Sequence, residues 1–313
     1  MLYRTLGRTG LRVSLLSLGT GGPSNFGQST GVPEPDIHRL VRRALDVGVN
    51  IFDTAAGYRD SEAILGRALK GVPRDRYYLA TKFTPEQEEE VVTPQDVVES
   101  VEHSLTRLQT DSVEILQFHG VRPKQYQAVM ERLLPTVLKL RDQGKCRWIG
   151  ITEQYGEDGA HEMLQMALED DHFATAMVGY NLLNQSADRL VYPQCLERNV
   201  GVFIMFAVRR VLAVRERLEE TVADLKRRGL VAPDALPDRK PLDWLIKGNV
   251  DSIPSAAYKF AAMHPAASTV LSGTANLEHF ESNLCALEDP TLPEDDYARL
   301  HDLFGQVIDP IGN

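Results

Sequence analysis

The sequence predicts a single-domain α/β protein whose parallel strands close into a barrel. Short apolar segments alternate with amphipathic stretches of helical period. The second to seventh predicted strands begin near residues 50, 77, 113, 147, 175 and 201, at intervals of about 26 to 36 residues. Each interval holds one strand, one crossover helix and two short loops, which implies parallel strands with right-handed crossovers. No linker rich in Gly, Ser or Pro divides the chain, so residues 1–313 are expected to form one domain.

Eight apolar segments qualify as strands, which favours a closed (β/α)8 TIM barrel. An open doubly wound sheet would normally carry Gly-x-Gly-x-x-Gly directly after its first strand. Residues 19–24 fail that pattern at the sixth position and precede a proline-rich loop instead of a helix. The predicted strands lie at residues 11–18, 49–52, 77–81, 113–118, 146–151, 174–178, 200–206 and 268–271.

The predicted helices carry apolar residues at intervals of three and four. Thr93 precedes Pro94, and a capping residue followed by proline at the first helical position is typical of a helix start. Gln143 and Gly144 end the helix that begins at Tyr126. The predicted helices lie at residues 37–47, 63–69, 93–108, 126–140, 160–168 and 187–197, with another starting near Asn276 and a C-terminal packing helix within 290–304.

The regular spacing breaks once, after the seventh predicted strand. The excess, about residues 209–250, contains a charged amphipathic stretch at 211–228 and a proline-spaced run at 233–241. We interpret it as a helical insertion over the catalytic face, serving as a substrate lid, an oligomer contact or plain surface. A second irregular stretch, residues 86–90, is a run of charge expected on a solvated loop.

Composition excludes several function classes. The formal net charge of −10 repels phosphate backbones and anionic lipid surfaces, which argues against nucleic-acid and membrane partners. No apolar run approaches the roughly 18 residues of a membrane span, and the first residues lack an apolar signal core. We therefore expect a cytoplasmic protein with reduced thiols at Cys146, Cys195 and Cys285. Cys-x-x-Cys is absent and the stretch at 161–165 lacks a second histidine, so no metal site is predicted.

Three neighbouring strand ends carry chemically active side chains. Asp53 follows the second predicted strand, Lys82 the third and His119 the fourth, with Tyr58 on the loop after Asp53. Catalytic groups in such barrels sit at the carboxyl ends of the strands, so these four side chains are expected around one mouth.

The set is suited to proton transfer to an oxygen. A tyrosine, with a reference pKa of about 10, is a weak acid at neutral pH. An ammonium at Lys82, kept charged by Asp53, is expected to lower the pKa of Tyr58. A neutral His119 could then hydrogen-bond a carbonyl and orient it toward the phenol.

These residues stand in motifs that resemble the aldo-keto reductase family. The stretch at 48–69 is similar to the first signature of that family, and residues 3–14 to the hairpin that plugs the barrel floor. Residues 81–83 and 117–119 match the lysine and histidine positions, and 147–152 and 271–283 match later motifs. The resemblance, over about residues 2 to 285, implies NAD(P)H-dependent reduction of an aldehyde or ketone without metal. It implies that Tyr58 donates the proton, that Lys82 and Asp53 adjust the pKa of Tyr58 and that His119 orients the carbonyl.

The resemblance also implies cofactor contacts. Thr152 and Glu153 stand where the family binds the nicotinamide carboxamide with Ser-Asn, and Asn181 is expected to compensate for Met177, which replaces a glutamine. Phe206 stands where an aromatic ring stacks on the nicotinamide. NADP(H) is favoured by the habit of the family and NAD(H) is possible. Arg209 and Arg210 are candidates for binding the pyrophosphate, or else form a surface pair that is salt-bridged to the acidic insertion. Gly273 stands where many NADP-specific members have a lysine, and His279 where they often have an arginine. The full predicted set is Gly21, Thr152, Glu153, Asn181, Phe206, Arg209, Arg210, Ser272, Gly273, Thr274, His279 and Asn283.

Two other functions compete with the reductase. A barrel of this family can instead be a cofactor-sensing regulatory subunit with weak or vestigial activity. A Schiff-base enzyme using Lys82 is disfavoured, because Asp53 would keep that amine charged. The expected partner is a small-molecule carbonyl or alcohol. The substrate, the oligomeric state and the role of the insertion stay open, because they depend on loops whose conformation the sequence does not determine.

Overall fold

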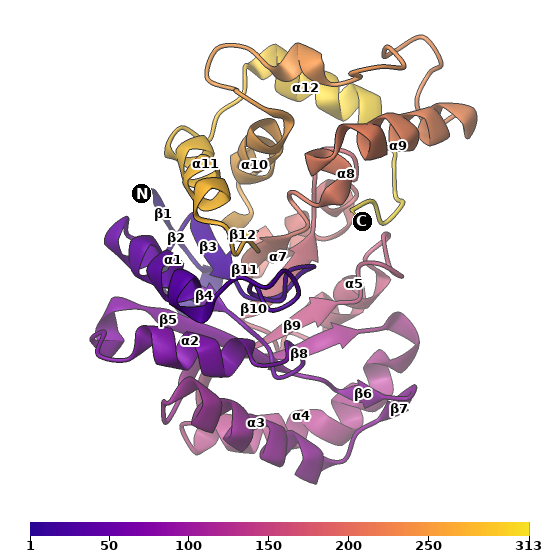
Figure 1. The fold of residues 1–313 in the computed structure, drawn as a ribbon. Helices are drawn as coiled ribbons and strands as arrows, with labels where there is room; N and C mark the ends of the chain where they lie inside the picture. Colours follow the sequence, from indigo (N-terminus) through magenta and orange to yellow (C-terminus); the bar gives the residue numbers. More distant parts are fainter. Residues whose placement is uncertain (313) are drawn as a thin grey trace.

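The computed structural model describes residues 1–312 and confirms the predicted barrel (Figure 1). Within these residues, eight parallel strands close in the order β10-β11-β12-β3-β4-β5-β8-β9. Since all of them run the same way, their carboxyl ends form a single mouth. The strands are β3 (Leu16–Gly19), β4 (Ile51–Asp53), β5 (Tyr78–Phe83), β8 (Val113–Val121), β9 (Cys146–Glu153), β10 (Thr175–Gly179), β11 (Gly201–Met205) and β12 (Ala267–Ser272).

A short antiparallel hairpin closes the barrel floor, formed by β1 (Tyr3–Thr5) and β2 (Arg12–Ser14). Its apolar side chains Leu6 and Leu11 belong to the same buried cluster as the inward-facing Ile115 of β8. The prediction of one strand over 11–18 is therefore wrong in one respect. The run divides at Leu15 into the second hairpin strand and the first barrel strand.

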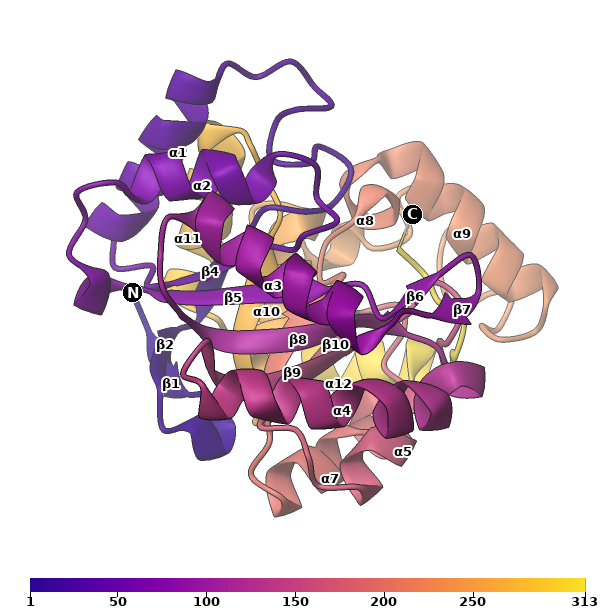
Figure 2. The same ribbon diagram turned by 90° about the horizontal axis from the view of Figure 1, so that it is seen from below.

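An outer layer of helices covers the strands, as Figure 2 shows for α1 to α4. Thr93 caps α3 as predicted, in a capping box with Asp96. The predicted helix at 187–197 is broken in two at Val191. The outer helices are α1 (Glu34–Asp46), α2 (Ser61–Leu69), α3 (Pro94–Leu108), α4 (Tyr126–Asp142), α5 (Glu162–Glu169), α6 (Ala187–Leu190), α7 (Tyr192–Glu197), α10 (Ile253–Met263) and α11 (Leu277–Glu288).

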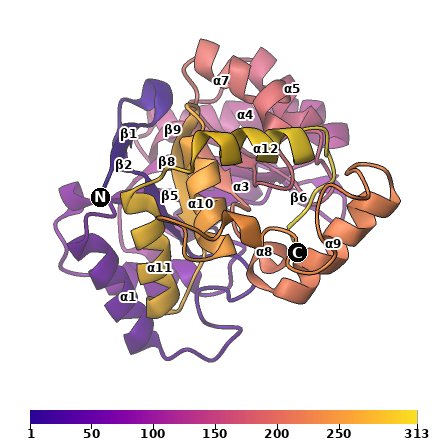
Figure 3. The same ribbon diagram turned by 90° about the horizontal axis from the view of Figure 1, so that it is seen from above.

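The insertion after β11 is helical, as predicted, but it contains two α-helices, α8 (Arg210–Ala213) and α9 (Arg215–Arg227), and a one-turn 3-10 helix at Asp243–Leu245. Leu218, Val222 and Leu225 bury the inner face of α9. The C-terminal tail lies beside α8 and α9 in Figures 1 and 3. Asp309 of the tail forms a 2.8 Å ion pair with Arg228, directly after α9. The insertion and the tail thus form one side of the barrel mouth.

Helix α10 was not predicted, and α12 (Glu294–Phe304) packs across it as the expected C-terminal helix (Figure 3). The contact includes the rings of Phe260 and Tyr297, whose centroids are 5.1 Å apart. Every residue of α10 from Ser255 to Ala262 is buried. A helix buried on all sides has no polar face, so its sequence lacks the amphipathic period that identifies the other helices.

The prediction for the charged run at 86–90 is confirmed in part, because residues 87–90 are exposed, but the run is not a plain loop. It forms a small antiparallel hairpin of β6 (Glu86–Gln87) and β7 (Glu90–Val91). Glu86 is buried and its carboxylate lies 2.9 Å from the guanidinium of Arg122. Among the described helices, none is both long and apolar enough to span a membrane.

Candidate active site

The four residues predicted at the strand ends come together at the barrel mouth. Asp53 is the last residue of β4, and Lys82 lies near the end of β5. The Lys82 ammonium donates to Asp53 Oδ2 at 2.6 Å and to the backbone oxygen of Thr54 at 2.7 Å. The hydroxyl of Tyr58 lies 3.3 Å from His119 Nε2, and Lys82 Nζ lies 4.9 Å from the centre of the Tyr58 ring. The structure therefore places a buried ion pair directly behind a phenol and an imidazole.

Burial and charge set the protonation of the ion pair. Burial raises the pKa of Asp53, against the opposing effect of Lys82 and of a hydrogen bond from Gln117. Burial alone would lower the pKa of Lys82, but the Asp53 carboxylate and Tyr58 together outweigh burial and hold the pKa above its usual value. Lys82 is thus an ammonium at neutral pH, as the sequence analysis expected.

The pKa of Tyr58 departs from expectation. Desolvation by the surrounding protein raises the pKa of the phenol, and the charge of Lys82 lowers it. Desolvation is the stronger effect, so the net pKa lies above its usual value. The direction predicted from the sequence is therefore reversed. Burial also lowers the pKa of His119 to about 3, with help from Lys82. At neutral pH the site presents a protonated phenol and a neutral imidazole.

Gln117 and Gly21 support this cluster, although neither was predicted to have a catalytic role. Gln117 is fully buried and donates from Nε2 to Asp53 Oδ1 at 3.2 Å. Gly21, predicted as a cofactor contact, lies against the Tyr58 ring, since a Cβ at this position would be 2.5 Å from a ring carbon. A glycine is therefore required at position 21 for the phenol to keep its place.

The side chains of Thr152 and Glu153 both form hydrogen bonds with other residues of the protein. The Thr152 hydroxyl oxygen accepts the backbone N–H of Gly120 at 2.7 Å. Glu153 Oε1 accepts the backbone N–H of Gly179 at 2.7 Å, and its Oε2 lies 2.7 Å from Nδ1 of His161. Both oxygens of the carboxylate thus have protein partners, which no motif in the sequence indicated.

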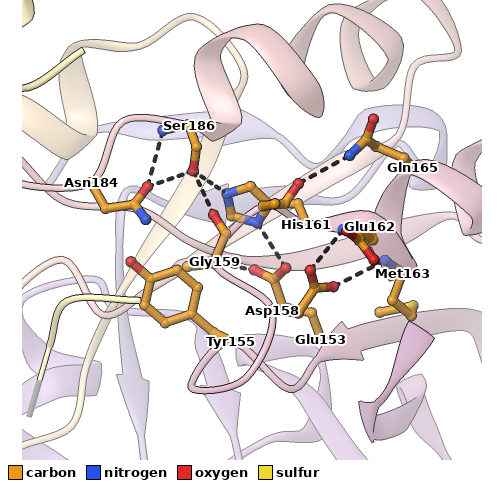
Figure 4. A network of polar contacts seen from close by, with 12 residues as sticks. Glu153, Tyr155, Asp158, Gly159, His161, Glu162, Met163, Gln165, Asn184 and Ser186 are labelled. Carbon is orange, nitrogen blue, oxygen red and sulfur yellow. Dashed lines mark hydrogen bonds and ion pairs between the residues drawn. The ribbon is translucent and has the colours of Figure 1, made fainter. Parts of the chain in front are cut away.

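Glu153 belongs to a buried polar network, shown in Figure 4. His161 Nε2 lies 2.8 Å from the hydroxyl of Ser186. Ser186 in turn donates to Asn184, whose side-chain N–H donates to the tail at the Asp309 carbonyl, 2.6 Å away. The Ser186 hydroxyl uses its one proton to donate to an acceptor oxygen, so toward His161 its oxygen can only accept. Nε2 of His161 therefore carries a proton and donates it to Ser186. The network joins the end of β9 to the C-terminal tail.

We expect Glu153→Gln to be tolerated and Glu153→Ala to destabilise the fold. A glutamine can accept from Gly179 and donate to Nδ1 of a neutral His161, so every hydrogen bond is kept. Alanine leaves two buried partners unsatisfied, at about 1–3 kcal/mol each. Urea unfolding of both variants measures the difference. Equal stability of the alanine variant and the wild type would contradict this account.

Asn181 and Phe206 contact the C-terminal tail. Asn181 Nδ2 donates to the carbonyl of Ile311 at 2.9 Å. The ring of Phe206 lies 4.8 Å from that of Tyr155, and a Cβ on Gly312 would be 2.5 Å from it. Residues 309–312 therefore cover the two side chains predicted to contact the nicotinamide.

The structure separates the two predicted arginines. Arg210 is exposed, whereas the Arg209 guanidinium lies 4.3 Å from the Phe206 ring centre and faces Tyr58. Burial lowers the pKa of Arg209, opposed by the phenolate form of Tyr58 and helped by the charge of Arg210. The pair is thus not a surface pair, because only one of its members points into the mouth.

The predicted contacts after β12 follow a strand that lies between β11 and β3 in the barrel. Ser272 accepts from Asn283 at 2.9 Å, and Asn276 caps α11 by accepting the backbone N–H of His279. The hydroxyl of Thr274 bonds within its own turn. A Cβ at Gly273 would meet only the Gly21 carbonyl, at 3.7 Å, so the backbone here is open to a ligand. His279 is exposed.

Comparisons with known proteins agree with this architecture. The profile of the Aldo/keto reductase family matches residues 17–304. Two solved structures share the fold at 24% identity. Aldo-keto reductase AKR11C1 from Bacillus halodurans, in its holo form, has a TM-score of 0.72 over 97% of this chain and 96% of its own. A Pseudomonas aeruginosa protein described as an aldo-keto reductase has a TM-score of 0.64 over 92% of this chain and 95% of its own.

Curated relatives match over shorter regions. L-galactose dehydrogenase from Arabidopsis thaliana is 39% identical over 154 residues, which are 48% of this chain and 47% of that protein. Aldo-keto reductase YhdN from Bacillus subtilis is 29% identical over 70% of this chain and 66% of its own length. The chain therefore spans about half the length of the first relative and just under two thirds of the second.

Proposed function

The chain belongs to the aldo/keto reductase family, and from that premise we propose that it is an NAD(P)H-dependent oxidoreductase interconverting an aldehyde or ketone with its alcohol. One observation carries the proposal. A phenol and a neutral imidazole, 3.3 Å apart, face the mouth in front of a buried Lys82–Asp53 pair. This arrangement supplies a proton and a hydrogen bond to one oxygen atom, as reduction of a carbonyl requires.

Each of the four side chains has a role in this proposal. The nicotinamide, when bound, supplies or accepts the hydride. Tyr58 gives its proton to the substrate oxygen, and Lys82 stabilises the phenolate that remains. Asp53 keeps Lys82 charged. Neutral His119 donates from Nε2 to the same oxygen and so orients the substrate.

The mouth fits the phosphate-bearing part of a dinucleotide. Gly21, Gly22 and Gly273 leave the backbone between the ends of β3 and β12 without side chains. A Cβ at Gly22 would meet only the Arg209 guanidinium, at 3.9 Å. Bare backbone beside a guanidinium is a suitable setting for phosphate oxygens. The carboxamide contacts expected of Glu153 and Asn181 fit less well, because both side chains have protein partners.

We expect Arg209→Met to weaken dinucleotide binding and Arg210→Met to leave it nearly unchanged. A hydrogen bond to a charged group contributes about 1.5–3 kcal/mol, so the dissociation constant should rise roughly 10- to 100-fold for Arg209→Met. Arg210 is exposed and serves as the matched control. Fluorescence titration with NADPH measures both. Equal binding by the two variants would remove Arg209 from the site.

Cofactor preference is a separate proposal. We favour NADPH over NADH, although Gly273 and His279 stand where NADP-specific relatives carry cations. Dissociation constants for the two reduced cofactors decide this, and tighter binding of NADH would reverse the preference.

The function is tested by following NADPH or NADH absorbance with a panel of carbonyls and alcohols. The likeness to L-galactose dehydrogenase makes aldoses, oxidised with NAD⁺ or NADP⁺, the first class to include. Turnover of any member supports the proposal. Tight retention of the nucleotide with no turnover across the panel would favour the regulatory subunit instead.

A further inference from the structure

We propose that Gln117 is a positioning residue that keeps Asp53 ionised and directed at Lys82, and so sets the pH range in which Tyr58 transfers its proton. The inference rests on the proposed function. Gln117 does not face the substrate in this proposal; it acts through Asp53.

The geometry assigns each oxygen of Asp53 its own donor. Lys82 bonds to Oδ2 at 2.6 Å and Gln117 Nε2 to Oδ1 at 3.2 Å. The opposite amide orientation would place Gln117 Oε1 against the carboxylate, so repulsion excludes it. As placed, Oε1 has no hydrogen-bond partner among the described residues. The contact with Asp53 is therefore the one polar interaction that this buried side chain makes within the described chain.

The neighbouring strands make room for the amide. In the sheet register, Gln117 of β8 lies beside Lys82 of β5 on one side and Gly150 of β9 on the other. A Cβ on Gly150 would be 2.9 Å from Cγ of Gln117. A glycine in β9 thus allows the long side chain to lie inside the barrel, where it reaches across to β4.

The charges around Asp53 explain what the hydrogen bond does. Lys82 approaches from β5, Tyr58 from the loop after β4 and His119 from β8, while β3 contributes no titratable side chain. Arg209, which follows β11, lies close enough to Tyr58 for its charge to lower the pKa of the phenol. Burial favours the neutral carboxyl, and the donors Lys82 and Gln117 oppose it.

Loss of the Gln117 donor should favour transfer of a proton from Lys82 to Asp53. Oδ1 would then lack a donor in a dry site, and the neutral carboxyl would be favoured. If Asp53 takes the proton of Lys82, the resulting neutral amine no longer stabilises the phenolate. The pKa of Tyr58 would then rise further.

The experiment compares wild type, Gln117→Met and Gln117→Glu. Methionine has a similar shape and no donor. In alcohol oxidation Tyr58 must be a phenolate, so kcat/KM rises with pH until the phenol is ionised. We expect Gln117→Met to shift this rise upward by at least about one pH unit, which is a tenfold loss of rate below the midpoint.

Gln117→Glu tests the donor itself. A protonated glutamic acid can donate to Asp53 as the amide does, so carbonyl reduction at low pH should stay within a few-fold of wild type. As the new carboxyl ionises it repels Asp53, and the rate should fall with rising pH. In alcohol oxidation, by contrast, the rate loss of Gln117→Met should shrink as the pH rises above its shifted midpoint.

The outcomes separate this inference from the proposed function. An unshifted profile in a folded Gln117→Met variant overturns the inference, as does a rate loss that is the same at every pH. Should that variant not fold, a pH-independent rate ratio for Gln117→Glu overturns it as well. Full activity of Tyr58→Phe would instead overturn the proposed function itself.

Discussion

Replacing Tyr58 by phenylalanine is expected to abolish turnover while leaving cofactor affinity nearly unchanged. A positioned general acid contributes about 10²- to 10⁴-fold in rate, and the phenol is the acid in this site. Phenylalanine keeps the ring that packs on Gly21 and lies 4.9 Å from the Lys82 ammonium. The loss should therefore fall on kcat and not on folding or binding.

Tyr155→Phe is the matched control. Tyr155 is another buried tyrosine at the same mouth, and its hydroxyl contacts the Ile311 carbonyl at 3.5 Å and the side chain of Asn181. Single-turnover rates and cofactor titrations on both variants separate chemistry from binding. If Tyr58→Phe is as active as Tyr155→Phe, the proton comes from another group.

The convergence of Asp53, Lys82, Tyr58 and His119 was predictable because barrel topology turns sequence positions into spatial ones. Parallel strands end at one mouth, so residues at three successive strand ends must meet there. The prediction needed only the strand positions, and these follow from apolar segments and their spacing. The same logic holds for the predicted residues after β12, a strand that ends at the same mouth between β11 and β3.

Contacts made by loops and by the C-terminal tail were not predictable. Glu153 stands at a strand end, which is the right position for a cofactor contact, yet its carboxylate is bonded to His161 instead. The backbone of His161 is left-handed, with φ of 57°, and this directs its ring toward Glu153. The Asp309–Gly312 tail covers Phe206 and Asn181 from the far end of the chain. Such contacts depend on loop conformation, which neither spacing nor periodicity specifies.

The reversed pKa of Tyr58 has a related cause. The sequence places an ammonium near the phenol, and that effect is present in the structure. Its size relative to desolvation depends on how closely the protein surrounds the ring. The sign of the shift is a balance between two opposing effects, and a sequence indicates only that both exist.

Replacing Lys82 by methionine is expected to remove activity and to destabilise the protein as well. The ammonium is fully buried, 2.6 Å from Asp53, and its loss leaves a buried carboxylate with only Gln117 as a side-chain donor among the described residues. Breaking a buried ion pair at one partner costs about 3–5 kcal/mol. Urea unfolding at neutral pH measures this.

The loss of stability should depend on pH in a definite direction. Without Lys82, the folded-state pKa of Asp53 lies further above its unfolded value of about 3.9. A group with a raised folded pKa favours folding below its unfolded pKa, and that contribution is lost as the pH rises through the folded pKa. The variant should therefore be closest to wild type near pH 4 and fall behind as the pH increases.

A second substitution separates charge from packing. Adding Asp53→Asn to Lys82→Met removes the buried carboxylate and keeps a side chain of similar shape. The double variant should regain most of the lost stability and lose its dependence on pH, yet remain inactive because no ammonium faces Tyr58. If Lys82→Met is equally destabilised at every pH, or if the double variant recovers nothing, packing of the lysine stem and not the ion pair governs stability at this position.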